Sequence, residues 1–146
     1  MKMKIKIKKL HPDALMPTQG TADAACFDLY AVENVTLAAK QPRRKISTGI
    51  AMEIPAGYCG RVYSRSSSFL KGLDVGSLVV DADYRGEIFV MAGYTSKSIG
   101  DEFYSIKKGD RIAQIRIEKL VLTEFEWADE LSVTERGTGG YGSTGR

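Results

Sequence analysis

The chain has 146 residues, of which 43% are hydrophobic and 27% are charged, and its net charge is +3. This size and composition predict one globular domain that buries a core without disulfide or metal staples, and they exclude a disordered chain. The weak positive charge does not favour a protein that binds along a nucleic-acid duplex.

Membrane, secretory and metal classes are also disfavoured. No apolar run approaches the roughly 20 residues of a spanning helix, and the charged N-terminus lacks the apolar stretch of a signal peptide. Cys26 and Cys59 are the only cysteines and have no metal-ligand spacing, so we expect free thiols in a cytoplasmic or nuclear protein. His11 is the only histidine, which argues against His-based triads and multi-histidine metal sites.

The first half of the chain predicts short strands. Residues 1–10 alternate between apolar residues and lysines, which indicates a half-exposed strand near a sheet edge. A loop follows, and then strands are expected at 24–31, 32–37, 46–54 and 58–63. The serine-rich segment after residue 63 predicts one helical turn, capped by Ser66 or Ser67 and ended by Gly72.

The second half predicts a hairpin followed by three more strands. Residues 78–80 and 88–91 have the pattern of two paired strands. Their turn carries Asp81, Asp83, Tyr84 and Arg85, where simple turn residues would be enough. Strands are expected at 103–106 and 111–119, and the alternation in 121–127 predicts the last core strand.

About ten closely spaced strands predict an all-β fold, an antiparallel sandwich or barrel with one short helix. From residue 132 no hydrophobic period remains, and five glycines fall within 136–146. The expected division is therefore a β-barrel domain at 1–131 and a flexible glycine-rich C-terminal arm at 132–146.

Three segments have chemistry suited to phosphate. The arm holds arginines among glycines, whose N–H groups form anion-binding nests, and a tyrosine that can stack on a base. The serines after residue 63 and the polar Gln114 within an apolar strand are the other two. Each segment alone fits an unstructured end, a capping serine or a buried amide equally well. Together with the acidic hairpin they favour a nucleoside triphosphate pocket.

Five segments in fixed order resemble the motifs of the trimeric deoxyuridine triphosphate nucleotidohydrolase (dUTPase) family. They read AACFDLYA at 24–31, GRVYSRSS at 60–67, GSLVVDADYRG at 76–86, GDRIAQ at 109–114 and RGTGGYGSTG at 136–145. The resemblance spans nearly the whole chain, and the last three motifs are the most specific as a set.

The resemblance implies a jelly-roll-like β fold and a homotrimer with active sites shared between subunits. It implies hydrolysis of dUTP to dUMP and pyrophosphate, with Mg²⁺ held mainly by the triphosphate and water. Asp81 would activate the water that attacks the α-phosphorus in line. Tyr84 would pack against the deoxyribose and exclude a 2′-hydroxyl.

The resemblance also assigns the remaining substrate contacts. The α- and β-phosphates would be held by Arg65, Ser66, Ser67 and Gln114. The other contacts would be Arg136, Ser143 and Thr144 at the γ-phosphate, Tyr141 over the uracil as the arm closes, and Val79 and Gly142 as further substrate-binding positions. Asp28 would support structure. Four positions depart from the usual motifs, namely Cys26, Ser64, Leu78 and Tyr94.

Two alternatives remain at this point. A dCTP deaminase or a bifunctional deaminase–dUTPase has a related fold, but it needs an acid–base residue against the base, for which Glu87 is the only acid just past the turn. A non-catalytic nucleotide-binding regulator would keep the fold without the reaction. The set of Asp81, Gln114 and Arg136 favours an enzyme.

Overall fold

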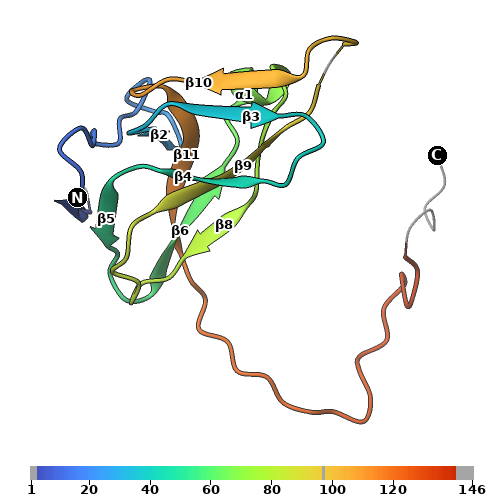
Figure 1. Cartoon of the computed structure of the whole chain (residues 1–146). Coiled ribbons are helices and arrows are strands. Elements are labelled where there is room, and N and C mark those ends of the chain that lie inside the picture. Colours follow the sequence, from blue (N-terminus) through green and yellow to red (C-terminus); the bar gives the residue numbers. More distant parts are fainter. Residues whose placement is uncertain (1–2, 97, 141–146) are drawn as a thin grey trace.

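Eleven strands and one short helix form the part of the chain that the computed structural model describes, residues 3–96 and 98–140 (Figure 1). The elements are β1 (Lys6–Lys9), β2 (Phe27–Tyr30), β3 (Val35–Ala38), β4 (Arg44–Ser47), β5 (Ile50–Glu53), β6 (Tyr58–Tyr63), α1 (Ser66–Leu70), β7 (Leu73–Val75), β8 (Leu78–Val80), β9 (Phe89–Tyr94), β10 (Phe103–Ile106) and β11 (Arg111–Lys119). The predicted all-β class is confirmed.

The strands form four small antiparallel sheets around one core. Their orders are β2-β11-β6-β8, β4-β9-β7, β1-β5 and β10-β3. Neighbours in these sheets are mostly distant in sequence, as expected of a jelly-roll-like fold rather than a meander. The core consists of the inward-facing side chains of these strands, and it includes the fully buried Ile46, Val62 and Val90.

The predicted strand at 46–54 is divided in two. β4 ends at Ser47 and pairs with β9, whereas β5 begins at Ile50 and pairs with β1. Gly49 lies between them with a φ of +67°, in the left-handed region that favours glycine. A Cβ at this position would lie 2.7 Å from the Cβ of His11, so the crossing also needs glycine for space.

The predicted hairpin is wrong in its pairing. β8 pairs with β6, through Val80 opposite Gly60, and β9 pairs with β4 and β7. The two predicted hairpin strands therefore belong to different sheets. Apolar alternation identified both strands but carries no information about the partner of either one.

The predicted cap of the helical turn is also wrong. Arg65 occupies the N-cap position with extended backbone and makes no side-chain cap hydrogen bond. The end of the turn agrees with expectation, because Gly72 has a φ of +88° and its N–H bonds to the carbonyl oxygen of Phe69.

Residues 121–127 form no strand, so the prediction of a last core strand is wrong for this chain on its own. Phe125 is 93% exposed and Trp127 is 105% exposed. Figure 1 shows the segment after β11 running away from the sheets. The alternation is real, but within the described residues it has no core to face.

The structure also describes both cysteines. Cys26 and Cys59 are both free thiols, and Cys59 is buried. No helix among the described residues is long and apolar enough to cross a membrane.

Candidate active site

The candidate site lies between β8 and β9, the two strands that residues 81–88 connect. β7 and β9 pair at the base, with Val75 opposite Ala92, and the N–H of Gly76 bonds to the carbonyl oxygen of Met91 at 2.8 Å. Beyond this point β8 leaves β9 to join β6. A cavity of about 250 Å³ opens between β8 and β9, and we refer to it as the β8–β9 cavity or, in the proposals below, as the nucleoside cavity. It is lined by Lys45, Leu78, Val79, Val80, Asp81, Tyr84, Glu87, Ile88, Phe89 and Met91.

The turn at the tip presents its polar groups to this cavity. Asp81 and Tyr84 both line it, and Asp83 does not. The N–H of Tyr84 bonds to the carbonyl oxygen of Asp81 at 3.1 Å, which closes the turn. Tyr84 is 44% exposed, and its hydroxyl donates to the carbonyl oxygen of Glu87 at 2.9 Å. The phenol ring is thus fixed by its hydroxyl, and it lines the same cavity as the exposed Asp81.

Glu87 and Ile88, which lead into β9, are fixed by hydrogen bonds to residues 47–49 at the junction of β4 and β5. The Oε1 atom of Glu87 accepts hydrogen bonds from the Ser47 hydroxyl and from the N–H of Gly49, the latter at 2.8 Å. The Thr48 hydroxyl donates to the carbonyl oxygen of Ile88. One oxygen of the Glu87 carboxylate therefore holds the cavity wall in place.

A second cluster gathers three of the sequence motifs around Asp28. The Nε of Arg65 lies 2.8 Å from Asp28 Oδ1, and Nη1 of Arg111 lies 3.5 Å from Asp28 Oδ2. The Asp28 side chain is only 12% exposed. Two guanidinium groups therefore compensate one nearly buried carboxylate, as a buried charge requires.

The strand register brings Gln114 to this cluster. Gln114 lies opposite Asp28 on β2 and opposite Tyr63 on β6. Its amide nitrogen donates to the carbonyl oxygen of Ser64 at 2.7 Å, which ties β11 to the entry of the helical turn. Ser66 and Ser67 are exposed at the start of that turn.

The two clusters stay apart within one copy of the chain. Arg65 and Gln114, which belong to the Asp28 cluster, are not among the residues that line the β8–β9 cavity. Arg136 bonds to the carbonyl oxygen of Gly139 at 2.9 Å, within its own segment. The other predicted arm residues lie outside the described part of the chain, namely Tyr141, Gly142, Ser143 and Thr144.

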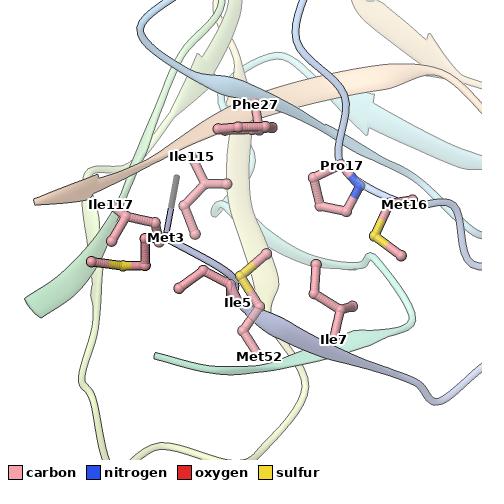
Figure 2. A pocket seen from close by; sticks show the side chains of 9 residues that line it. All are labelled: Met3, Ile5, Ile7, Met16, Pro17, Phe27, Met52, Ile115 and Ile117. Carbon is pink, nitrogen blue, oxygen red and sulfur yellow. The ribbon is translucent and has the colours of Figure 1, made fainter. Parts of the chain in front are cut away.

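A larger cavity has no polar chemistry to offer. It has a volume of about 290 Å³, and Figure 2 shows apolar side chains converging on it from β1, β2, β5 and β11. Its lining residues are Met3, Ile5, Ile7, Met16, Pro17, Phe27, Met52, Ile115 and Ile117. It is a surface for burying apolar groups rather than a reaction site.

Comparison with known proteins agrees with the order of the motifs. A family model described as dUTPase matches residues 13–145. The chain is 44% identical over 147 residues to the deoxyuridine 5′-triphosphate nucleotidohydrolase of Nautilia profundicola, a match that covers 99% of this chain and 100% of that relative. The chain belongs to the dUTPase family.

Two further relatives support this assignment. The protein of the same name from Paramecium bursaria Chlorella virus 1 is 42% identical over 140 residues, covering 95% of this chain and 96% of its own length. Among solved structures, the dUTPase of Staphylococcus bacteriophage 80alpha, determined with dUPNHPP, superposes with a TM-score of 0.89 at 28% identity and covers 99% of this chain and 100% of its own.

Leu78 and Tyr94, two of the four departures from the dUTPase motifs, differ in their relation to the cavity. Leu78 lines the cavity while part of its side chain packs on the core. Tyr94 does not line the cavity. It is 6% exposed, its ring centroid lies 5.6 Å from that of Tyr104, and its hydroxyl donates to Asp101. Tyr94 therefore anchors the C-terminal end of β9, the strand that forms one wall of the cavity.

Motif reasoning missed several cavity residues of this dUTPase family member. Lys45 and Phe89 line the cavity from β4 and β9, and neither carried a signal of function in the sequence. Gly86 ends the third motif, and the sequence assigns it no role of its own. A Cβ at Gly86 would lie 2.6 Å from Cζ of Tyr84, so this glycine makes room for the phenol ring.

Proposed function

We propose that the chain hydrolyses dUTP to dUMP and pyrophosphate. The observation that carries the proposal is the cavity between β8 and β9, which both Asp81 and Tyr84 line. Its dimensions suit a nucleoside, and the relatives that resemble the chain along nearly its whole length are named for action on dUTP.

Asp81 is the proposed general base. Its carboxylate is exposed at the turn, so it can hold a water molecule by hydrogen bonds and accept its proton. The water oxygen attacks the α-phosphorus, and the bond from that phosphorus to the oxygen bridging to the β-phosphorus breaks. The products are dUMP and pyrophosphate, formed by in-line displacement. Tyr84 packs against the deoxyribose, and Val79 lines the cavity as a further substrate contact.

The Asp28 cluster is the proposed phosphate site. Arg65, Ser66, Ser67 and Gln114 would bind the α- and β-phosphates, since guanidinium and hydroxyl groups are good partners for phosphate oxygens. Asp28 acts through Arg65, because the 2.8 Å contact of Nε with Asp28 and the 3.3 Å hydrogen bond from Nη1 to the carbonyl oxygen of Arg111 fix the guanidinium and leave Nη2 to bind an anion. One Asp28 carboxylate thus orders the arginines of two motifs.

Homotrimer formation with shared sites is part of the proposal. Within one copy, the proposed phosphate site and the nucleoside cavity have no lining residue in common, and in the proposal a second copy brings them together. Large apolar side chains after β11 are also exposed, which indicates a surface that another copy covers. They are Val121, Leu122, Phe125, Trp127, Leu131 and Val133.

The arm at 132–146 is proposed to close over the bound nucleotide. Arg136, Ser143 and Thr144 would bind the γ-phosphate, while Tyr141 stacks on uracil and Gly142 allows close backbone approach. Closure would exclude water from the reacting phosphate and can limit turnover. The division between the barrel domain and the arm belongs to this proposal.

Mg²⁺ is the proposed cofactor. Among residues 3–96 and 98–140, no group of three His, Cys, Asp or Glu side chains could hold a metal ion. In the proposal the ion binds through triphosphate oxygens and water, which requires no such group. When bound, it would neutralise negative charge on the phosphates.

The deaminase alternative is weakened by the contacts of Glu87. A deaminating glutamate must exchange protons with the base, whereas Glu87 Oε1 accepts bonds from Ser47 and Gly49. The regulator alternative gives no reason for an exposed carboxylate at the cavity mouth.

Pyrophosphate release and nucleotide products should be measured side by side on dUTP, dTTP, dCTP and UTP with Mg²⁺. We expect dUTP to be turned over far faster than the others. Conversion of dCTP to a uracil nucleotide at a comparable rate would support the deaminase instead, and binding without any turnover would support the regulator.

A further inference from the structure

Lys45 reaches the nucleoside cavity although neither the motifs nor the proposed chemistry uses it. It belongs to β4, where it lies opposite Met91 of β9, while Ser47 lies opposite Phe89. Because alternate residues of a strand share one face, the side chains of Lys45, Met91 and Phe89 lie on the same face of this pair. All three line the cavity.

The ammonium group of Lys45 lies over one aromatic ring of this cavity. Lys45 is exposed, and its Nζ lies 3.6 Å from the centroid of the Phe89 ring, a cation–π contact that favours this position of the stem. Among the described residues that line the cavity, Lys45 carries the only positive charge. None of the ion pairs formed within residues 3–96 and 98–140 involves it, so its N–H donors are available to a ligand.

We infer that Lys45 is a specificity-determining residue that recognises a carbonyl oxygen of the pyrimidine base. The inference rests on the proposed function, which puts the sugar against Tyr84 at the mouth of the cavity. Because Phe89 and Lys45 line the same cavity as Tyr84, a base attached to that sugar would come within reach of both side chains.

The chemistry at position 4 of the pyrimidine ring explains the selectivity. Uracil carries a carbonyl oxygen there and accepts a hydrogen bond from the ammonium group. Cytosine carries an amino group, whose N–H bonds would face another donor. A charge-assisted hydrogen bond gained by one base and denied to the other corresponds to a preference of about tenfold to a hundredfold for 4-oxo pyrimidines.

Three variants separate the charge from the bulk of the side chain. Lys45→Met keeps an unbranched apolar stem against Phe89 and removes the ammonium group, and Lys45→Arg keeps a cation. Lys8→Met is the matched control, because Lys8 is an exposed lysine on β1 and does not line the cavity. The probes are the α,β-imido analogues of dUTP and dCTP, whose dissociation constants are measured by calorimetry with Mg²⁺ present.

We expect Lys45→Met to reduce the preference for the uracil analogue by about tenfold or more. Lys45→Arg should retain most of the preference and Lys8→Met all of it. A folded Lys45→Met protein, verified by its melting temperature, whose preference stays within about twofold of wild type would overturn the inference. Wild-type dUTP turnover tests the proposed function separately, because binding preference is measured whether or not the protein is active.

Discussion

Replacing Gly86 by alanine tests whether the position of the Tyr84 ring controls the candidate site. A Cβ at position 86 would lie 2.6 Å from Cζ and 2.9 Å from Cε2 of Tyr84. Non-bonded carbons approach to about 3.5 Å, so the ring has to move by roughly 1 Å. This movement would break the 2.9 Å hydrogen bond from the Tyr84 hydroxyl to the carbonyl oxygen of Glu87.

The expected cost in stability is small, because the ring is 44% exposed and can move into solvent. Loss of the hydrogen bond costs about 1 kcal/mol, which lowers the melting temperature by about 2–4 °C. The expected cost in activity is larger. A misplacement of about 1 Å can reduce a rate by about 100-fold, so we expect kcat/KM for dUTP to fall by about tenfold to 100-fold.

The same change should weaken sugar discrimination, since the displaced Tyr84 ring no longer fills the space beside the 2′ carbon. The assay is pyrophosphate release from dUTP and from UTP. Gly20→Ala is the matched control, because a Cβ there has nothing within 4 Å. A folded Gly86→Ala protein with wild-type kcat/KM and an unchanged preference for dUTP over UTP would refute the role assigned to the Tyr84 ring.

Three further predictions test other parts of the proposal. Asp81→Asn should reduce dUTP turnover by orders of magnitude while the imido analogue still binds in calorimetry, and unchanged turnover would remove Asp81 from the reaction. Deleting residues 136–146 should likewise abolish most pyrophosphate release but leave the melting temperature and the sedimentation coefficient of the assembly nearly unchanged; full activity would end the arm hypothesis. The hydrogen bond to Asp101 raises the pKa of Tyr94 to about 12 from its ordinary value of 10.0. The folded state therefore holds this proton more tightly than the unfolded state, and the stabilisation is present below about pH 10 and lost as pH rises through about 12. The unfolding free energy of wild type relative to Tyr94→Phe should fall over that window, and a constant difference would contradict the assignment.

Individual side chains of the candidate site were predictable because their chemistry is unusual for their local structure. A hairpin turn does not need a phenol beside two carboxylates, and an apolar strand does not need Gln114. The structure places Asp81 and Tyr84 at one cavity, and Gln114 beside the cluster of Asp28 and Arg65. The contacts of these residues with a nucleotide remain predictions.

The partners of the strands were not predictable, because alternation marks a half-buried strand without specifying its neighbour. Lys45 illustrates the consequence. Its sequence neighbours Arg43 and Arg44 make it look like part of a solvated basic turn, and only the pairing of β4 with β9 brings it over Phe89. A cavity residue of this kind is defined by long-range register rather than by local sequence.

The prediction of a core strand at 121–127 was wrong for a related reason. Its alternation satisfies the rule for a core strand, yet the rule assumes that the core belongs to the same chain. With Phe125 and Trp127 exposed, the pattern is better explained by burial against another copy, which is the arrangement that the proposed trimer requires. Sequence periodicity records burial in the assembled protein, and a single chain displays only part of it.

The pairing of β8 with β6, rather than with β9, involves a glycine that has no role in the proposed reaction. Gly60 of β6 lies opposite Val80, and a Cβ there would lie 3.0 Å from Ile115, 3.1 Å from Ile54 and 3.2 Å from Val80. The missing side chain lets β8 pack closely against β6 and its core neighbours. β8 pairs with β6, β9 pairs with β4 and β7, and the cavity opens between β8 and β9. Glycine within a strand usually weakens the strand, but here it allows the close packing of β8 against β6 beside the candidate site.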